Sequence, residues 1–369
     1  MTGRERILAT VAGEKVDRIP VAPFVYSNVV REWKQDPATD VVSGTAEFYR
    51  HFGMDIIHRN FNIRHNDLVS APNWRVSQSS RTEGSEIRVT REIETPAGVL
   101  REVESLTALS PYMTVSAQIE CFIKDAEDFE IFRKYAPEPV PADFGDLRRA
   151  KAAVGEDGVT APWISGVFNY MARLRSLEEL ITDPYMEPDF YEMLAEFSLE
   201  RLKKAMEPVA GEGVDFVSLA GNLANGTMAG PRYYEEYVLP YESRLIRRLQ
   251  RDGIKVIYHN CGDAANMIAC YNRLMPDCYE YMTEPPYADN SLEKCLEAFD
   301  KRIALMGNVD QIRFLRQASP EEVYAHARHI LEMAGKRGRF ILGTSDLLEE
   351  NTPAENLFAL VRAARDAAC

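Results

Sequence analysis

The chain has little cysteine and little histidine, and it lacks a net positive charge. Only six of its 369 residues are cysteine, which is far from the dense disulfide framework of a small secreted protein. We therefore expect reduced thiols, and any cysteine at a strand end is a candidate ligand or nucleophile. The formal net charge of −14 disfavours nucleic acid and anionic membranes as partners.

Membrane and export signals are also missing. No apolar run approaches the roughly 20 residues that cross a bilayer. The opening residues, Met1 to Arg6, lead into an amphipathic stretch that contains an acidic residue and shows no cleavage-type signal. These features predict a cytoplasmic protein with no membrane partner.

The chain does contain enough apolar sequence for a large core, since 46% of its residues are hydrophobic and 27% are charged. Short apolar runs alternate with longer amphipathic patterns, which is typical of βα units and a parallel sheet. Eight runs are candidate strands: residues 19–25, 54–59, 159–165, 215–220, 254–260, 278–284, 303–308 and 340–345. Eight parallel strands with intervening helices close into a barrel. We predict one (β/α)8 TIM barrel domain over residues 1–369.

One region interrupts this alternation after the second strand. Residues 86–93 and 99–104 alternate polar and apolar side chains around Thr95-Pro96-Ala97-Gly98, which predicts a β-hairpin. The hairpin lies in an insertion that covers roughly residues 60–150. Such an insertion either roofs an active site or serves only as a structural flap.

Catalytic residues of such barrels come from the carboxyl ends of the strands. The fifth candidate strand ends in His259-Asn260-Cys261-Gly262-Asp263. Residues two apart on a strand face the same way, so His259 and Cys261 present an imidazole and a thiol to one place. The pair suits zinc. A buried histidine beside a packed cysteine is the structural alternative.

Other strand ends also carry polar residues. Glu284, after the sixth strand, is a candidate metal ligand or catalytic acid or base, and its alternative is to cap a turn or pair with an arginine. Asn308, after the seventh strand, is a candidate catalytic residue, whereas Trp163 is assigned to the core. Candidate substrate-binding residues at the remaining strand ends are His58, Arg59, Asn222, Thr344 and Asp346, with Arg64, His65 and Asn225 nearby.

Several segments, in order along the chain, carry a family resemblance. They are Arg4-Glu5-Arg6-Ile7, Gly13-Glu14-Lys15-Val16-Asp17-Arg18-Ile19-Pro20, Ala161-Pro162-Trp163, Tyr233-Tyr234-Glu235-Glu236-Tyr237-Val238-Leu239-Pro240-Tyr241, His259-x-Cys261-Gly262, Leu305-Met306-Gly307-Asn308-Val309-Asp310 and Thr352-Pro353-x-Glu355-Asn356. Together they resemble the uroporphyrinogen decarboxylase superfamily, which also contains corrinoid- and thiol-dependent methyltransferases. The resemblance misses mainly the hairpin insertion. It implies a TIM barrel, a substrate-facing role for Tyr170 and a homodimer.

The decarboxylase reaction itself is not expected. True uroporphyrinogen decarboxylases carry an Arg-Gln-Ala-Gly-Arg-Tyr segment after the first strand, whose arginines hold the substrate carboxylates. Here that stretch reads Phe24-Val25-Tyr26-Ser27-Asn28-Val29-Val30-Arg31, without paired arginines. Their histidine near the eighth strand is replaced by Thr344. A substrate with many carboxylates needs cationic groups in those places.

The methyltransferase branch implies a zinc site of the form His-x-Cys…Cys that binds a thiol and lowers its pKa. His259 and Cys261 match the first two ligands, Glu284 is the expected carboxylate ligand, and Thr344 stands where the final cysteine belongs. The resemblance therefore implies a zinc-assisted methyltransferase or demethylase that moves a methyl group between a small substrate and a corrinoid protein or a thiol. No cobalamin-binding domain is evident, so the corrinoid would arrive on a partner protein.

Two other functions stay open. One is a metal-independent decarboxylase or lyase that acts on a small carboxylic acid, with His259 and Glu284 as acid and base. The other is a non-catalytic, ligand-binding member of the superfamily that has lost a ligand at Thr344. Activity that survives chelators marks the first, and ligand-induced thermal stabilisation without turnover marks the second.

Overall fold

The computed structural model describes residues 1–61, 68–139 and 143–367, and its central feature is a ring of parallel strands. The ring strands are β1 (Ile56–His58), β6 (Gly158–Thr160), β7 (Trp163–Ser165), β8 (Phe216–Ala220), β9 (Lys255–His259), β10 (Cys278–Glu280), β11 (Ala304–Val309) and β12 (Phe340–Thr344). Strands β7 to β12 form one parallel sheet in sequence order, and β1 pairs with β6.

Strands β6 and β7 act as one barrel strand that is interrupted at Pro162. Proline has no N–H to donate to a neighbouring strand, so the regular pairing breaks there. The backbone still bridges the break, because Ala161 N donates to His58 O at 2.8 Å and Ser218 N donates to Pro162 O at 2.9 Å. The ladder thus continues from β1 through this segment to β8.

The amino-terminal segment around Val21 completes the ring. Leu342 N donates to Pro20 O at 2.9 Å, and Ala22 N donates to Leu342 O at 2.8 Å. On the other side, Asp55 N donates to Val21 O at 2.8 Å. Seven of the eight predicted strands are present in the predicted order, and the first, residues 19–25, takes its expected place through isolated bridges such as Val21 to Leu342. The prediction of a TIM barrel is confirmed.

Helices surround the barrel. They are α1 (Gly3–Ala12), α2 (Ser27–Lys34), α3 (Val41–Phe52), α4 (Ala126–Tyr135), α5 (Gly145–Val154), α6 (Val167–Leu174), α7 (Leu177–Met186), α8 (Pro188–Gly211), α9 (Gly230–Tyr233), α10 (Leu239–Arg251), α11 (Ile268–Leu274), α12 (Leu292–Ala298), α13 (Phe314–Gln317), α14 (Pro320–Arg337) and α15 (Ala354–Asp366). Short turns of other helix types are η1 (Gly155–Asp157), η2 (Asn222–Ala224) and η3 (Tyr234–Val238). Among the described helices, none has the length and apolar character needed to cross a membrane.

Alternate residues of the strands fill the barrel interior. Ile57, Ile257 and Cys278 belong to one buried apolar cluster, which also includes side chains from β6, β8, β11 and β12. Side chains two apart on a strand face the same way, so the next inward positions are Arg59, His259 and Glu280. These three polar residues stand at the carboxyl ends of their strands, which is the functional end of such barrels.

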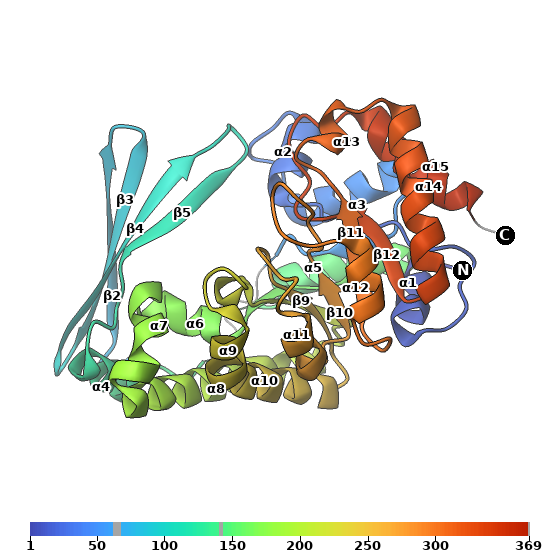
Figure 1. Cartoon of the computed structure of the whole chain (residues 1–369). Coiled ribbons are helices and arrows are strands. Elements are labelled where there is room, and N and C mark those ends of the chain that lie inside the picture. The colour runs from blue at the N-terminus through green and yellow to red at the C-terminus, as the bar shows by residue number, and fades with distance from the viewer. Residues whose placement is uncertain (62–67, 140–142, 368–369) are drawn as a thin grey trace.

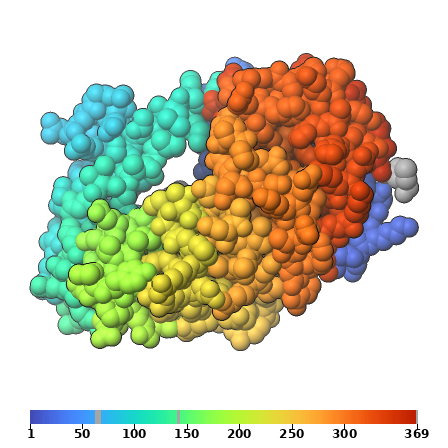
Figure 2. All heavy atoms as spheres, in the orientation of Figure 1, coloured from blue at the N-terminus to red at the C-terminus, as the bar shows by residue number. Residues whose placement is uncertain are grey.

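The insertion between β1 and β6 is larger than the predicted hairpin. It contains a four-stranded antiparallel sheet made of β2 (Arg75–Glu83), β3 (Glu86–Thr95), β4 (Gly98–Ala108) and β5 (Thr114–Glu120). The predicted hairpin is the β3–β4 pair, with Thr95 opposite Gly98. The sheet stands beside the barrel in Figure 1, and Figure 2 shows a hollow between the sheet and the C-terminal part of the barrel.

The turn between β4 and β5 reaches back to the barrel. Ser110 Oγ donates to Glu350 Oε1 at 2.8 Å, and Arg31 Nη1 donates to the backbone oxygen of Tyr112 at 3.3 Å. The insertion leaves the barrel from the carboxyl end of β1 and therefore lies at the same end as His259. It bounds the barrel mouth and can restrict what enters it.

Candidate active site

The centre of the site is a contact between two neighbouring barrel strands. His259 ends β9 and Glu280 ends β10, and the two residues are in register. Nδ1 of His259 lies 3.0 Å from Oε1 of Glu280, and both side chains are buried. The parallel register thus places an imidazole beside a carboxylate at the mouth of the barrel.

Arg59 joins this pair from the opposite side of the barrel. It follows β1, and its Nη1 donates to Oε1 of Glu280 at 2.5 Å. Its guanidinium carbon lies 4.8 Å from the ring centre of Phe24 and 5.8 Å from that of Trp163. A cation over aromatic faces, paired with a buried carboxylate, is held in one position.

Charges at the site fix the protonation of Glu280 and His259. Burial alone raises the pKa of Glu280, but the positive charge of Arg59 and the hydrogen bond from His259 bring it down to about 2. Glu280 is therefore ionised and can only accept hydrogen bonds, so Nδ1 of His259 carries the proton between them. Burial alone lowers the pKa of His259, but hydrogen bonds to Cys261 and Glu280 raise it to about 10.

Cys261 lies two residues beyond His259 and is a half-buried free thiol. Its backbone oxygen accepts from Nδ2 of Asn225 at 3.1 Å, which ties the loop after β9 to the loop after β8. The next residue, Gly262, has φ 122°, and a Cβ there would lie 2.6 Å from Nδ2 of Asn225. Only glycine fits this conformation and this close approach to the loop after β8.

Three aromatic rings and one more carboxylate surround His259. The ring of Trp163 stands perpendicular to the imidazole at 5.4 Å, Phe24 lies at 5.8 Å and Tyr281 at 6.2 Å. Asp346, after β12, is close enough for its charge and that of His259 to act on each other. Burial raises the pKa of Asp346, and the positive charge of His259 opposes that rise.

Glu284 does not join this group, which corrects the sequence expectation. Strand β10 ends at Glu280, four residues earlier than predicted, because Tyr281 adopts a left-handed backbone conformation with φ 88°. Glu284 is exposed, and its Oε1 accepts from the backbone N of Leu292 at 2.8 Å, at the start of α12. This is the capping role that formed the alternative interpretation, and Glu280 is the carboxylate that contacts His259.

His58 and Tyr170 are buried away from the site, against the sequence expectation. His58 is adjacent to the inward-facing Arg59 and therefore faces outward, where its Nε2 lies 2.6 Å from the backbone oxygen of Val42 in α3. Burial lowers its pKa to about 4. The hydroxyl of Tyr170, in α6, accepts from Nε of Arg201 at 3.1 Å on the outer helices.

The other candidates lie at the barrel mouth in different roles. Oγ1 of Thr344 accepts from the backbone N of Phe24 at 3.1 Å, and Oδ1 of Asn222 accepts from Nδ2 of Asn169 at 2.7 Å. Asn308 is buried on β11, and within the described part of the chain its Oδ1 has no hydrogen-bond partner. That unsatisfied oxygen is available to a substrate. Arg64 and His65 lie outside the described residues.

Sequence reasoning missed part of this site. Glu280, Phe24 and Tyr281 were not candidates, and Trp163 was assigned to the core although it faces His259. The signal for Glu280 was its position two residues after Cys278, which places it on the inward face of the strand. The aromatic residues gave no comparable signal, because an apolar ring at a strand end is equally typical of core packing.

A metal site is only partly assembled. Across residues 1–61, 68–139 and 143–367, no three histidine, cysteine, aspartate or glutamate side chains stand together at a spacing that would hold a metal ion. His259 and Cys261 supply two donors of the types that zinc prefers. Nε2 of His259 can act as the ligand atom once a metal displaces its proton, because Glu280 keeps the other ring proton on Nδ1.

The family relationship follows from the sequence. The family described as uroporphyrinogen decarboxylase (URO-D) matches residues 116–367, which is more than half of the chain. The chain therefore belongs to this family, as its motifs predicted. The matched region begins within the insertion sheet and includes the strands that carry His259 and Glu280 and the loop that carries Asp346.

Curated relatives and a solved structure are methyltransferases. The chain is 28% identical over 213 residues to a methylated-thiol–coenzyme M methyltransferase of Methanosarcina mazei, covering 56% of this chain and 52% of that protein. It is 21% identical over 253 residues to the methylcobamide:CoM methyltransferase MtbA of the same organism, covering 66% and 69%. The alignment thus spans about half of the first relative. A solved methyltransferase from Methanosarcina mazei superimposes over 100% of both chains with a TM-score of 0.68 and 16% identity, which supports the fold.

Proposed function

We propose that this protein is a methyltransferase that moves a methyl group between a small substrate and a corrinoid protein or a thiol, with zinc held at His259 and Cys261. The observation that carries the proposal is that His259 and Cys261 stand two residues apart at the carboxyl end of β9, at the mouth of the barrel, with the imidazole oriented by Glu280. The names of the curated relatives, which are thiol, methylcobamide and coenzyme M methyltransferases, support the same reaction class.

The donor types at this place fit zinc. An imidazole nitrogen and a thiolate sulfur are its commonest protein ligands, and a catalytic site keeps one position open for substrate. Asp346, which follows β12 at the same end of the barrel, is the carboxylate that we propose as a third donor in place of Glu284. It would have to move toward His259 and Cys261 when the metal binds, because among the described residues no three such side chains stand at metal-holding spacing. When bound, zinc would stabilise a substrate thiol as its thiolate, or polarise a methylated substrate.

The neighbouring residues have supporting roles in this proposal. Glu280 accepts a hydrogen bond from Nδ1 of His259 and so orients the ring with Nε2 toward the ligand position. Arg59 compensates the charge of Glu280. Phe24, Trp163 and Tyr281 line the site with apolar surface, which accommodates a methyl group and limits the access of water.

The overall transfer balances without an added oxidant or reductant. The new bond joins the methyl carbon to the acceptor, which is the substrate sulfur in the thiol reaction, and the thiol releases one proton. The bond to the methyl donor breaks, and its electron pair stays on the donor. A corrinoid that serves as donor or acceptor would be carried by a partner protein at the barrel mouth.

Metal content and methyl transfer test the proposal together. We would measure zinc in the purified protein by elemental analysis and follow methylation of coenzyme M with methylcobalamin as the donor. One equivalent of zinc is expected, with loss of zinc and of transfer in His259→Ala and Cys261→Ser. Glu284→Gln is the matched control, because it removes a nearby exposed carboxylate and should change neither. Zinc well below one equivalent, with unaltered transfer in both ligand variants, would exclude the metal-assisted reaction.

The buried cations at the site favour a second candidate. Arg59 can pair with a substrate carboxylate, and His259, whose pKa is raised to about 10 through its contacts with Cys261 and Glu280 against the effect of burial, can donate a proton. These groups suit a metal-independent decarboxylase or lyase that acts on a small carboxylic acid. Such an activity survives chelators and Cys261→Ser, and it is lost in His259→Ala.

A further inference from the structure

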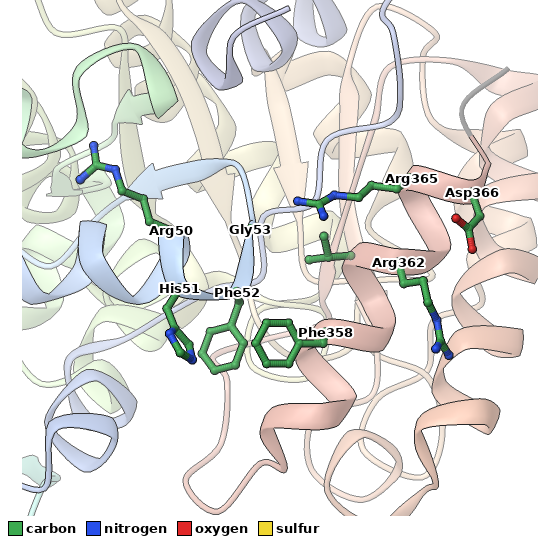
Figure 3. A pocket seen from close by; sticks show the side chains of 9 residues that line it. Arg50, His51, Phe52, Gly53, Phe358, Arg362, Arg365 and Asp366 are labelled. Carbon is green, nitrogen blue, oxygen red and sulfur yellow. The ribbon is translucent and has the colours of Figure 1, made fainter.

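A separate pocket of about 350 Å³ lies on the outside of the barrel, between the ends of helices α3 and α15 (Figure 3). Gly53, in its wall, ends α3 and comes just before β1, so the pocket lies near the amino end of that strand. His259 ends its own strand at the opposite end of the barrel. The pocket is therefore distinct from the candidate active site.

One wall of the pocket is aromatic. The rings of His51 and Phe52 lie 4.8 Å apart, those of Phe52 and Phe358 5.0 Å apart, and those of His51 and Phe358 5.8 Å apart. Phe358 is 45% exposed although it packs against both neighbours. The three rings stand side by side in Figure 3 and leave an apolar face on which a planar group can pack.

The other walls carry arginines that differ in the contacts they make. Arg50 is already paired, since its Nε lies 2.6 Å from Oδ2 of Asp157. Arg362 lies over the ring of Tyr324 at 4.8 Å. Asp366, which is the acidic residue of the pocket wall, accepts from the hydroxyl of Tyr324 at 3.0 Å.

Arg365 differs from these two arginines. Within the described ranges of the chain, no hydrogen bond or ion pair involves its guanidinium, which reaches across the pocket toward Gly53 in Figure 3. A Cβ on Gly53 would lie 2.6 Å from Nη2 of Arg365, so the glycine makes room for this arrangement. An unpaired guanidinium in a concave site of a chain with net charge −14 is a point of attraction for an anion.

From these contacts we propose that this pocket binds a small organic anion whose carboxylate or phosphate pairs with Arg365 while its planar apolar body packs on the exposed rings of Phe358 and His51. The volume is within the range of small-molecule sites and fits a molecule of about one ring. The fork of Arg365 suits bidentate pairing with either anionic group. This inference does not depend on the proposed methyl transfer.

Calorimetric titration of the full chain tests the proposal with phenyl phosphate, benzoate, inorganic phosphate and phenol as probes. At least one aromatic anion should bind, at least about tenfold more tightly than both inorganic phosphate and phenol, because neither of these makes both contacts. The preference between phenyl phosphate and benzoate identifies the anionic group. Binding should weaken as salt is added.

Variants locate the binding. Arg365→Gln and Phe358→Ala should each weaken it at least about tenfold, and Arg365→Lys should retain part of the affinity because the charge remains. Arg81→Gln, on the exposed strand β2, is the control and should leave affinity unchanged. Melting temperatures of all variants separate lost binding from lost folding. The proposal is overturned if neither aromatic anion binds at millimolar concentration, or if folded Arg365→Gln and Phe358→Ala bind as tightly as the parent.

Discussion

Nδ1 of His259 lies 3.0 Å from Oε1 of Glu280, the same oxygen that accepts from Nη1 of Arg59. One carboxylate oxygen thus holds a histidine and an arginine that come from different strands. The arrangement is costly to bury unless all its charges are compensated. Removing the carboxylate therefore tests both the stability of the barrel and the orientation of His259.

Glu280→Gln should lower the free energy of unfolding by about 3–5 kcal/mol, because it leaves the buried Arg59 without its counter-charge. Urea unfolding at neutral pH measures the change. Under the proposed function, zinc affinity should also fall about 10–100-fold, since Nδ1 of His259 loses its carboxylate acceptor. Glu284→Gln is the matched control and should cost no more than about 1 kcal/mol, the value of a helix-capping contact. Equal losses in the two variants would contradict the assignment of Glu280.

Asp346→Asn tests the third donor of the proposed zinc site. The asparagine keeps the size of the side chain but removes the charge that acts on His259. If Asp346 contributes a ligand, zinc titration should show weaker binding than in the parent, with a smaller loss than in Cys261→Ser. Unchanged zinc affinity, with a raised KM for the methyl acceptor, would instead assign Asp346 to substrate binding.

The barrel was predictable because each of its strands is a short apolar run. Strands β9 and β11 need apolar side chains on both faces, because one face packs in the barrel interior and the other packs against the outer helices. Strands β2 and β5 were not predictable in the same way. Almost all residues of β2 are exposed and only Val76 is apolar, so no alternation of polar and apolar residues marks this strand. In β5 Val115, Ala117 and Ile119 do alternate with polar residues, but these side chains are exposed and do not belong to the core.

The site was predictable in part for a related reason. His259 and Cys261 could be identified because side chains two apart on a strand face the same way and because the carboxyl end of a barrel strand lies at the barrel mouth. Tyr281 and Met282 continue the apolar pattern of the strand, so the expected strand ran on to Glu284. The left-handed conformation of Tyr281, φ 88°, ends the strand instead, and no local sequence signal marks that conformation at a tyrosine.

Glu242 should make stability depend on pH. This carboxyl group is fully buried in α10, where burial raises its pKa to about 7 although the backbone N–H groups of Phe168 and Val167 oppose the rise. The folded chain then holds a proton that the unfolded chain releases near its ordinary pKa of about 4.5. The free energy of unfolding should therefore fall as pH rises from about 4.5 to 7, by up to about 3 kcal/mol.

The matched substitution is Glu242→Gln, which keeps the shape and removes the titration. Urea unfolding at several pH values between 5 and 8 should show that the free energy of unfolding of the variant increases relative to that of the parent as pH rises, with little difference near pH 5. Glu332→Gln, at an exposed position in α14, is the control and should follow the parent at every pH. Parallel curves for the parent and Glu242→Gln would show that Glu242 stays ionised in the folded protein.

Gly221 follows β8 at the barrel mouth, and here the missing side chain makes room for Tyr258. A Cβ at this position would lie 2.2 Å from the hydroxyl oxygen of Tyr258, which is buried and hydrogen-bonded to the hydroxyl of Tyr234 at 2.7 Å. Because a ring held in this way cannot move aside without breaking that bond, Gly221→Ala should lower the free energy of unfolding by about 1–3 kcal/mol.

Gly211→Ala gives the opposite expectation and serves as the control. Gly211 ends helix α8, and among the described residues no atom of a neighbour lies within 4 Å of the position that a Cβ would take. The alanine should stabilise the chain by up to about 1 kcal/mol, since it restricts the unfolded backbone without a clash. Urea unfolding of the two variants separates the effects, since a general cost of replacing glycine would give both the same sign. Opposite signs would attribute the cost at Gly221 to its contact with Tyr258.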